Sequence, residues 1–243
     1  MVSVKILGVS GTFVKGGNCD IAVQEALKTA AKLGDVETEF VTLADKEIAP
    51  CKHCQWCIEH RSLCKVNDDA NGILQMMADA DGIIFGAPTW CRTMAPPLLN
   101  LFSRARSTTF FFQTLRNKVG GFISLGFLDF GLENCLEVME NLVYGHGVIP
   151  IARATALASG VALGRRPDYL EHGVLDDPRG MVFIQGVGER VVEVARMVKY
   201  ATQNGVVAAE PISLSTGTHL KPKKKVFVDG VWRDKEDKGK ASA

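Results

Sequence analysis

The strongest indication of the fold lies near the N-terminus, where the run VKILGV at residues 4–9 passes directly into SGTFVKGGNC at residues 10–19. The first run is apolar and β-branched, which is typical of a strand that is buried on both faces. Residues 18–33 then place apolar side chains at helical spacing, with Asn18 expected to cap this helix and Gly34 to end it. A buried strand, a glycine-rich turn and an amphipathic helix predict the first unit of an α/β sheet.

The same alternation of strands and helices continues along the chain. Further strands are expected at residues 36–43, 82–86, 119–125 and 148–157, and further helices at 70–80, 97–106, 133–144 and 187–204, with a loop over 164–180. This rhythm predicts a doubly wound parallel sheet whose two faces are covered by right-handed crossovers. Five strands suit the flavodoxin-like order 2-1-3-4-5, with a cysteine-rich loop after the second strand.

Composition and charge exclude several classes of protein. The 243 residues are 47% hydrophobic and 23% charged, close to the averages of globular proteins. The formal net charge is +1, which gives no electrostatic argument for binding nucleic acid. No apolar run reaches the roughly 18 residues of a spanning helix, and the N-terminus lacks the features of a signal peptide. We therefore expect a cytoplasmic protein with no nucleic-acid or membrane partner.

The chain divides into a main domain over residues 1–207 and a C-terminal extension over residues 208–243. The extension is rich in lysine and is expected to be partly disordered. Within it, residues 225–228 and 231–232 flank Asp229-Gly230, a pair that favours a hairpin turn.

Residues 10–19 offer the groups that bind a phosphate. They supply hydroxyls, Lys15 and glycines that let backbone amides approach a ligand, and a helix N-terminus follows. The segment matches neither the dinucleotide fingerprint nor the P-loop pattern. On spacing alone, a phosphate site and an ordinary glycine-rich turn both remain open.

The third expected strand leaves into GAPTWCRTMAPPL at residues 86–98. A strand that exits into proline, threonine and an aromatic residue can place backbone amides and a flat side chain against a planar ligand. The alternative is a tight turn whose Trp90 packs in the core.

Together these two loops resemble those of the NADPH-dependent FMN reductase group of flavodoxin-like proteins, over about residues 2–207. The resemblance implies that the first loop holds the phosphate of FMN through Ser10, Thr12, Lys15, Gly17, Asn18 and Cys19, the last through its backbone amide. It implies that the second loop frames the isoalloxazine ring through Pro88, Thr89, Trp90, Cys91, Arg92, Thr93 and Met94. A third loop after the fourth strand adds Ser124, Gly126 and Gly131, although paired glycines usual in the group are absent there.

Four of the seven cysteines crowd into a short segment, as Cys51, Cys54, Cys57 and Cys64 in a C-x2-C-x2-C-x6-C pattern. On a straight helix Cys51 and Cys57 would lie about 9 Å apart along the axis, so the segment must curl as a loop if the thiolates share one centre. Crowded cysteines in a cytosolic chain indicate metal or redox chemistry, and this set suits a [4Fe–4S] cluster. The alternatives are structural zinc, with four thiolates or with three and His53 or His60, and cysteines that hold nothing.

Within flavodoxin-like proteins this compact motif resembles that of the iron–sulfur flavoprotein family, with the cluster loop at residues 48–67. The resemblance implies one [4Fe–4S] cluster and one FMN per protomer, a homodimer or dimer of dimers, and a ferredoxin-type electron donor. The expected function is therefore that of an oxidoreductase that passes electrons between the cluster and FMN.

Two other functions remain open. The first is an NAD(P)H-dependent FMN or quinone reductase without a cluster, and the second is a non-catalytic flavin or nucleotide sensor whose loop holds zinc. Cys135 is expected to be a core thiol, and His146, between two glycines, a helix-end capping residue.

Overall fold

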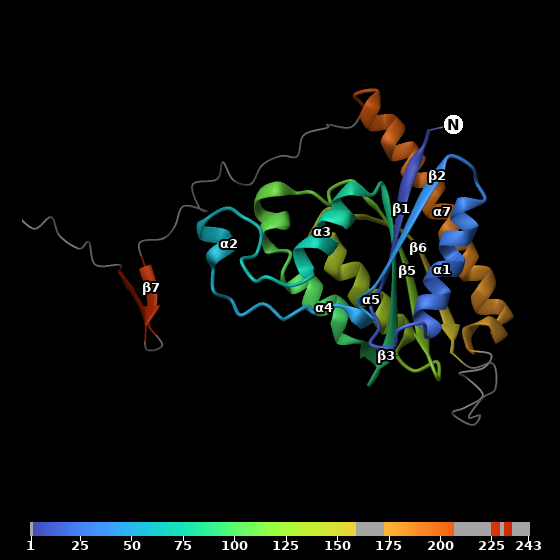
Figure 1. The fold of residues 1–243 in the computed structure, drawn as a ribbon, viewed down its shortest axis with the longest axis horizontal. Coiled ribbons are helices and arrows are strands. Elements are labelled where there is room, and N and C mark those ends of the chain that lie inside the picture. Colours follow the sequence, from blue (N-terminus) through green and yellow to red (C-terminus); the bar gives the residue numbers. More distant parts are fainter. Residues whose placement is uncertain (1, 159–172, 207–224, 229–230, 235–243) are drawn as a thin grey trace, which may run out of the picture.

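Five parallel strands form the central sheet of the computed structural model, which describes residues 2–158, 173–206, 225–228 and 231–234 (Figure 1). The strands are β1 (Val4–Ser10), β2 (Val36–Thr42), β3 (Gly82–Trp90), β5 (Val119–Gly126) and β6 (Ile149–Leu157). Their order is β2-β1-β3-β5-β6, which confirms the predicted flavodoxin-like order. The sequence did not predict β4 (Thr93–Met94), which pairs antiparallel with the end of β3.

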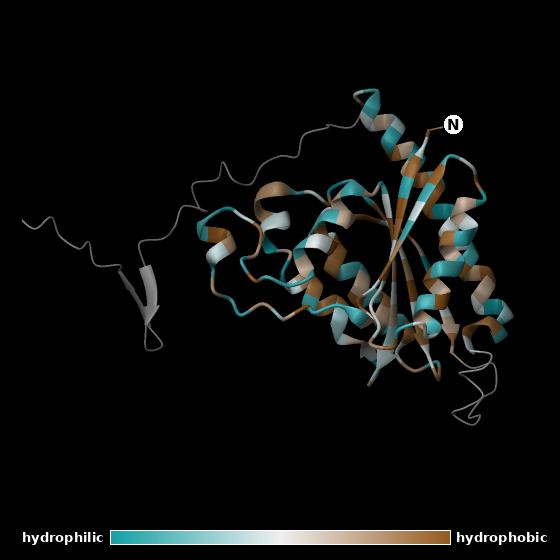
Figure 2. Ribbon diagram, in the orientation of Figure 1, coloured by the Kyte–Doolittle hydropathy of each residue, from teal (hydrophilic) through white to brown (hydrophobic). Residues whose placement is uncertain are grey.

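Helices cover both faces of the sheet. Helices α1 (Asn18–Ala31) and α7 (Pro178–Gln203) lie on one face, and α3 (Ala70–Asp79), α4 (Pro96–Ser103) and α5 (Leu132–Tyr144) lie on the other (Figure 1). These helices carry polar as well as apolar residues, as amphipathic helices must when only one side is buried (Figure 2). Shorter helical turns are η1 (Leu43–Asp45), α2 (Trp56–Glu59), η2 (Thr108–Phe112) and η3 (Gly173–Asp176).

The alternation of side chains along β1 explains the two cores. Leu7 and Val9 face the core under α3, α4 and α5, whereas Val4 and Ile6 face the core under α1 and α7. Because all five parallel strands run in one direction, the loops that follow them gather at one edge of the sheet, where such folds bind ligands.

Helix α1 differs from its prediction at both ends. It begins at Asn18 itself, with Gly17 as the N-cap, and ends at Ala31, before Gly34. The predicted capping role of Asn18 is therefore wrong. Its side-chain Oδ1 instead accepts the backbone N–H of Val174 at 2.7 Å.

Helix α7 begins at Pro178 rather than at residue 187, so the end of the predicted loop over 164–180 is wrong. The side chain of Asp177 accepts the N–H of Gly180 at 2.9 Å, and Pro178 occupies the first turn, where its missing N–H costs nothing. The earlier part of that loop, residues 159–172, lies outside the described residues.

The hairpin expected in the C-terminal extension is confirmed, because β7 (Lys225–Val228) pairs antiparallel with β8 (Val231–Asp234). The rest of residues 208–243, whose partial disorder was expected, lies outside the described residues. In the part of the chain that the structure describes, no helix has both the length and the apolar character needed to cross a membrane.

Candidate functional site

The loop after β1 is closed by hydrogen bonds of its own. The hydroxyl of Thr12 accepts the N–H of Val14 at 3.0 Å, and the carboxylate of Asp20, from the first turn of α1, accepts the N–H of Gly16 at 2.7 Å. Lys15 extends from this loop to an ion pair with Asp45 at 2.7 Å, close to the start of the cysteine-rich loop. The loop is thus held in shape before any ligand binds.

The start of α1 offers backbone donors to an anion. The N–H groups of Asn18 and Cys19 belong to the first helical turn, where backbone N–H groups have no carbonyl acceptor within the helix. The helix dipole also favours negative charge there. The Cys19 thiol is buried, and burial raises its pKa to about 12. The Asn18 side chain uses only its Oδ1 for Val174, whereas the buried Cys19 thiol leaves the Cys19 backbone amide as the group that could face an anion.

The predicted second loop is partly strand. Pro88 continues the pairing of β3 with β5, opposite Leu125, and Trp90 pairs with Thr93 of β4. The expectation that residues 86–98 form a loop is therefore wrong up to Trp90. A longer β3 holds Pro88, Thr89 and Trp90 more rigidly than a loop would.

Cys91 and Arg92 form the two-residue turn between β3 and β4, with φ values of 48° and 70°. Both residues thus adopt the left-handed conformation of a type I′ hairpin turn, which glycine and asparagine normally occupy. Non-glycine residues in this conformation carry strain and are often found at functional sites.

The third loop supports this turn. Asn134 Nδ2 donates to the carbonyl of Arg92 at 2.9 Å, and Gly131, at φ 82°, lies directly against the Arg92 backbone. A Cβ at residue 131 would lie 2.5 Å from Arg92 Cα, so the contact requires glycine. The loops after β3 and β5 therefore form one continuous edge.

Exposed aromatic rings line this edge. Phe13, from the first loop, is 51% exposed and stacks on Trp90, which is 46% exposed. The Arg92 guanidinium lies 5.7 Å from the centre of the exposed Phe130 ring. Phe13 and Phe130 were not among the predicted site residues, although aromatic residues within two ligand loops are a signal for a planar ligand.

Other predicted site residues support the loops from beneath. The side chains of Ser10, Ser124 and Met94 are buried. The hydroxyl of Thr89 donates to the carbonyl of Leu125 at 3.2 Å, and a Cβ on Gly126 would lie 2.7 Å from that hydroxyl oxygen. These residues shape the edge from beneath, and the buried hydroxyls of Ser10 and Ser124 have no hydrogen-bond partner among the described residues.

The cysteine-rich loop runs from η1 to α3 and carries α2 beyond α3 and α4 (Figure 1). Cys57 is buried, Cys51 and Cys64 are half-buried and Cys54 is exposed. Burial raises the pKa of Cys57, Arg106 opposes the shift, and the nearby thiols of Cys64 and Cys51 add to it. Cys57 is thus within electrostatic reach of Cys51 and of Cys64, but no three His, Cys, Asp or Glu side chains of the described residues form a ready metal site.

Both ends of the cysteine-rich loop are fastened to neighbouring helices. The N–H of Cys51 donates to Ser103 Oγ at 3.0 Å, and Asn71 Nδ2 donates to the carbonyl of Cys64 at 2.8 Å. The buried Arg104 guanidinium bonds Asp68 at 2.6 Å. Burial opposes ionisation of Asp68, but the hydrogen bonds from Arg104 and two backbone amides hold its pKa below its usual range.

The two histidines of the loop are engaged elsewhere. The ring of His53 hydrogen-bonds Gln55 Nε2 at 2.9 Å, and His60 Nδ1 hydrogen-bonds the carbonyl of Trp56 at 3.0 Å. Because a zinc-bound histidine commonly donates its second ring N–H to a backbone carbonyl, the contact of His60 is compatible with the alternative in which a histidine completes a zinc site.

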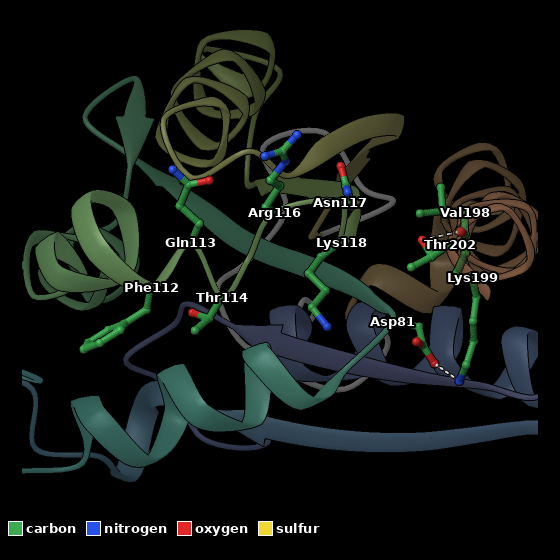
Figure 3. A pocket seen from close by; sticks show the side chains of 11 residues that line it. Asp81, Phe112, Gln113, Thr114, Arg116, Asn117, Lys118, Val198, Lys199 and Thr202 are labelled. Atoms are coloured by element: carbon green, nitrogen blue, oxygen red, sulfur yellow. Dashed lines mark hydrogen bonds and ion pairs between the residues drawn. The ribbon is translucent and has the colours of Figure 1, made fainter. Parts of the chain in front are cut away.

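A cavity of about 350 Å³ lies at the opposite, amino-terminal end of the strands (Figure 3). Asp81 and Lys199 line it and form an ion pair at 2.8 Å, and Lys118 points into the same space. Burial lowers the pKa of Lys118, and Asp81 opposes the shift. The cavity contains none of the predicted site residues, so the candidate site is the carboxyl edge with the adjoining cysteine-rich loop.

Comparison with known proteins agrees with this site. Residues 4–162 match the model of the NADPH-dependent FMN reductase family. The chain is also 35% identical over 199 residues to an iron-sulfur flavoprotein of Methanocaldococcus jannaschii, a match that covers 81% of this chain and 100% of the relative. The chain belongs to the iron-sulfur flavoproteins of the NADPH-dependent FMN reductase family. The family resemblance stated from the loops and cysteines is thereby confirmed.

A second sequence relative and one solved structure are also similar to this chain. An iron-sulfur flavoprotein of Methanosarcina thermophila is 35% identical over 152 residues, covering 61% of this chain and 77% of the relative. A crystal structure of RosB with a bound riboflavin-5′-phosphate derivative shares the fold, with a TM-score of 0.65 and 18% identity over 89% of this chain and 93% of that one. Family membership makes the protein an oxidoreductase with a flavin redox function, and it supports FMN as the flavin.

Proposed function

We infer that the protein passes electrons between FMN at the carboxyl edge of the sheet and a [4Fe–4S] cluster held by Cys51, Cys54, Cys57 and Cys64. Bound FMN supplies one- and two-electron chemistry, and the cluster supplies one-electron chemistry. The chain contributes the binding groups, the spacing of the two centres and the surroundings that set their potentials.

The flavin part of the proposal rests on the edge formed by the three loops. N–H groups at the start of α1 suit the phosphate because they and the helix dipole favour a dianion, and Lys15 could add its charge by leaving Asp45. The exposed rings of Phe13 and Trp90 and the backbone of the Cys91–Arg92 turn suit a planar ring system. Residues that fix these groups, such as Gly131, would keep the flavin oriented.

The observation that carries the cluster part is a pair of N–H groups, each directed at the sulfur of one predicted ligand, Cys51 or Cys64. The N–H of His53 lies 3.4 Å from Cys51 Sγ, and Arg104 Nε lies 3.1 Å from Cys64 Sγ. Hydrogen-bond donors to sulfur suit a thiolate-ligated cluster, whose sulfurs carry negative charge. Cys54 is exposed and would complete the set with Cys57.

Anaerobic reconstitution with iron and sulfide tests this proposal. We expect about four irons and four sulfides per chain, with a broad visible band that bleaches on reduction. Cys54→Ser should lose the cluster without harm to the fold, because Cys54 is exposed. Cys135→Ala is the matched control, since this buried thiol lies in the core, as predicted, and should leave the iron content unchanged. A wild-type protein without iron, or equal iron in Cys54→Ser, would refute the cluster.

The alternative function, NAD(P)H-dependent FMN or quinone reduction without a cluster, predicts a different result. Bound FMN would then be bleached rapidly by NADPH alone, at the same rate in wild type and in Cys54→Ser. The sensor alternative predicts zinc rather than iron in the loop. It also predicts no turnover, either with NADPH or with a ferredoxin-type carrier as electron donor. A ferredoxin-type carrier as the sole effective donor supports the proposal.

The proposed assembly is a homodimer or a dimer of dimers. Trp56 and Leu63 of the cysteine-rich loop and the nearby Phe112 are exposed apolar side chains that a second copy would cover. Sedimentation of the reconstituted protein should give a dimer or tetramer mass, and a monomer would contradict this part.

A further inference from the structure

Arg104 is a buried cation at the C-terminal end of α4, and its side chain is 1% exposed. All of its guanidinium N–H groups have acceptors in the protein. Nε donates to Cys64 Sγ at 3.1 Å, Nη1 to Asp68 Oδ2 at 2.6 Å and the Ala49 carbonyl at 2.9 Å, and Nη2 to Asp68 Oδ1 at 3.2 Å and the Val66 carbonyl at 3.5 Å. A planar five-donor group saturated in this way has a fixed position.

The acceptors lie on the two ends of the cysteine-rich loop. Ala49 precedes the first cysteine, whereas Cys64, Val66 and Asp68 include and follow the last. Arg104 therefore joins both ends of the loop to the end of α4, which already holds Cys51 through Ser103. The tip of the loop, with Cys54, is not bonded to this clamp.

Asp68 balances the charge of Arg104. Its carboxylate receives two N–H groups of Arg104 and also the backbone N–H groups of Ala49, at 3.1 Å, and Ala70, at 3.2 Å. The pair therefore places little net charge beside Cys64. The main effect of Arg104 on Cys64 is therefore one directional hydrogen bond, which Nε–H donates to the Cys64 sulfur.

We propose that Arg104 is a positioning residue for the cluster, which fixes Cys64 as a ligand and raises the reduction potential through its N–H···S contact. This inference rests on the proposed function. An N–H donor such as Arg104 Nε would stabilise the more negative, reduced state of a bound cluster, because that state places more charge on the ligand sulfurs. Asp68 holds the donor in place and at the same time limits how far Arg104 raises the potential.

Two variants with opposite expected shifts test the proposal. Arg104→Lys keeps the charge but loses the planar fork, so one ammonium cannot serve both Asp68 and Cys64. Its cluster should be harder to reduce, and each tenfold loss in the reduction equilibrium corresponds to about 59 mV for a one-electron couple. Asp68→Asn leaves the charge of Arg104 uncompensated, so its cluster should be easier to reduce.

Arg196→Lys is the matched control. Arg196 also clamps backbone carbonyls, donating to Val2, Leu33 and Gly34, but it lies on α7, on the other face of the sheet. Its replacement should leave the potential of the cluster unchanged. Equal potentials in Arg104→Lys and wild type, or shifts of the same sign in Arg104→Lys and Asp68→Asn, would overturn the proposal.

The clamp has a second readout that needs no cluster. In full-length protein without cofactors, trypsin should cut the cysteine-rich loop, at Lys52 or Arg61, several-fold faster in Arg104→Lys than in wild type and in Arg196→Lys. An unchanged rate would overturn the clamp even if the variant holds no iron. A wild-type chain that takes up no iron would refute the proposed function instead, so the two failures are distinguishable.

Discussion

The rings of Phe13 and Trp90 stack with their centres 5.2 Å apart and an angle of 29° between their planes. Phe13 comes from the loop after β1, and Trp90 comes from the end of β3. The contact joins the loop suited to a phosphate to the turn suited to a flat ring, so one aromatic surface spans the two halves of the proposed flavin site.

Trp90→Ala should weaken FMN binding, because it removes half of this aromatic surface while the side chain carries no core packing. Loss of ring stacking and apolar contact costs about 1–2 kcal/mol, which corresponds to about a five- to thirtyfold higher dissociation constant. Titration with FMN, followed by quenching of flavin fluorescence, measures this change. Trp90→Phe should retain most of the affinity, and equal affinity in Trp90→Ala would place the flavin elsewhere.

Gly131→Ala should weaken FMN binding by distorting the Cys91–Arg92 turn. The new methyl group would lie 2.5 Å from Arg92 Cα, and φ at residue 131 is 82°, which an alanine adopts only with strain. We expect a cost of about 1–3 kcal/mol in stability together with a higher dissociation constant for FMN. Chemical unfolding and the same fluorescence titration measure the two effects.

Gly72→Ala is the control for Gly131→Ala. Gly72 lies inside α3, and a methyl group there would meet nothing within 4 Å. It should stabilise the protein by about 0.5–1 kcal/mol and leave FMN binding unchanged. If both alanine variants bound FMN as wild type does, the contact between the third loop and the Arg92 turn would have no role in the site.

The order of the five main strands was predictable because buried β-branched runs and amphipathic helices alternate clearly along the chain. The start of α7 was also readable in principle. Asp177 followed by Pro178 is a helix-start signal, but the surrounding glycines and charges obscured it. The end of β3 was not predictable, because Pro88 and Trp90 are held there by pairing with β5 and β4, which a local pattern does not show.

The candidate site was predictable as a set of residues but not in its internal support. The cysteine spacing identified the loop, whereas nothing near Arg104 in the sequence links it to Cys64, which lies 40 residues away. Likewise the sequence places Phe13 in the first loop but does not show that it stacks on Trp90, which lies far along the chain. Long-range contacts of this kind depend on how α4 and β3 pack, which composition and periodicity do not specify.

Asp81→Ala should lower stability and leave the flavin site intact. Asp81 Oδ2 accepts the Lys5 N–H at 2.9 Å and the Lys199 ammonium at 2.8 Å, so it joins β1, the start of β3 and α7 at the amino end of the sheet. Loss of these charged hydrogen bonds should cost about 1.5–3 kcal/mol in the free energy of unfolding. Urea unfolding measures the loss, and fluorescence titration should give an unchanged FMN dissociation constant.

Asp79→Ala provides the comparison for Asp81→Ala. Among the described residues, Asp79 hydrogen-bonds the exposed Gln75 side chain on the same helix and otherwise acts on Lys118 only through its charge, so its loss should cost no more than about 0.5 kcal/mol. A weaker FMN affinity in Asp81→Ala alone would mean that the amino end of the sheet, with its cavity, influences the flavin site.

His146 should make the protein less stable as the pH falls from about 6.5 to about 4. The sequence suggested a helix-end capping residue, but Gly145 is the C-cap, and the His146 ring packs against Phe102 with its Nδ1 2.7 Å from Thr109 Oγ1. Burial lowers the pKa of His146 to about 4, so the unfolded chain binds this proton more readily than the folded chain. The contribution of His146 to stability is therefore complete above the pKa of this residue in the unfolded chain, about 6.5. It decreases by up to about 3 kcal/mol as the pH falls to the pKa in the folded chain, about 4.

His146→Asn tests this prediction, because asparagine keeps a partner for Thr109 but does not titrate. The pH dependence of urea unfolding should therefore be smaller in this variant. The other histidines are present in both wild type and His146→Asn, so their effects cancel when the two pH profiles of the free energy of unfolding are subtracted. Identical profiles would show that the pKa of His146 is the same in the folded and the unfolded chain.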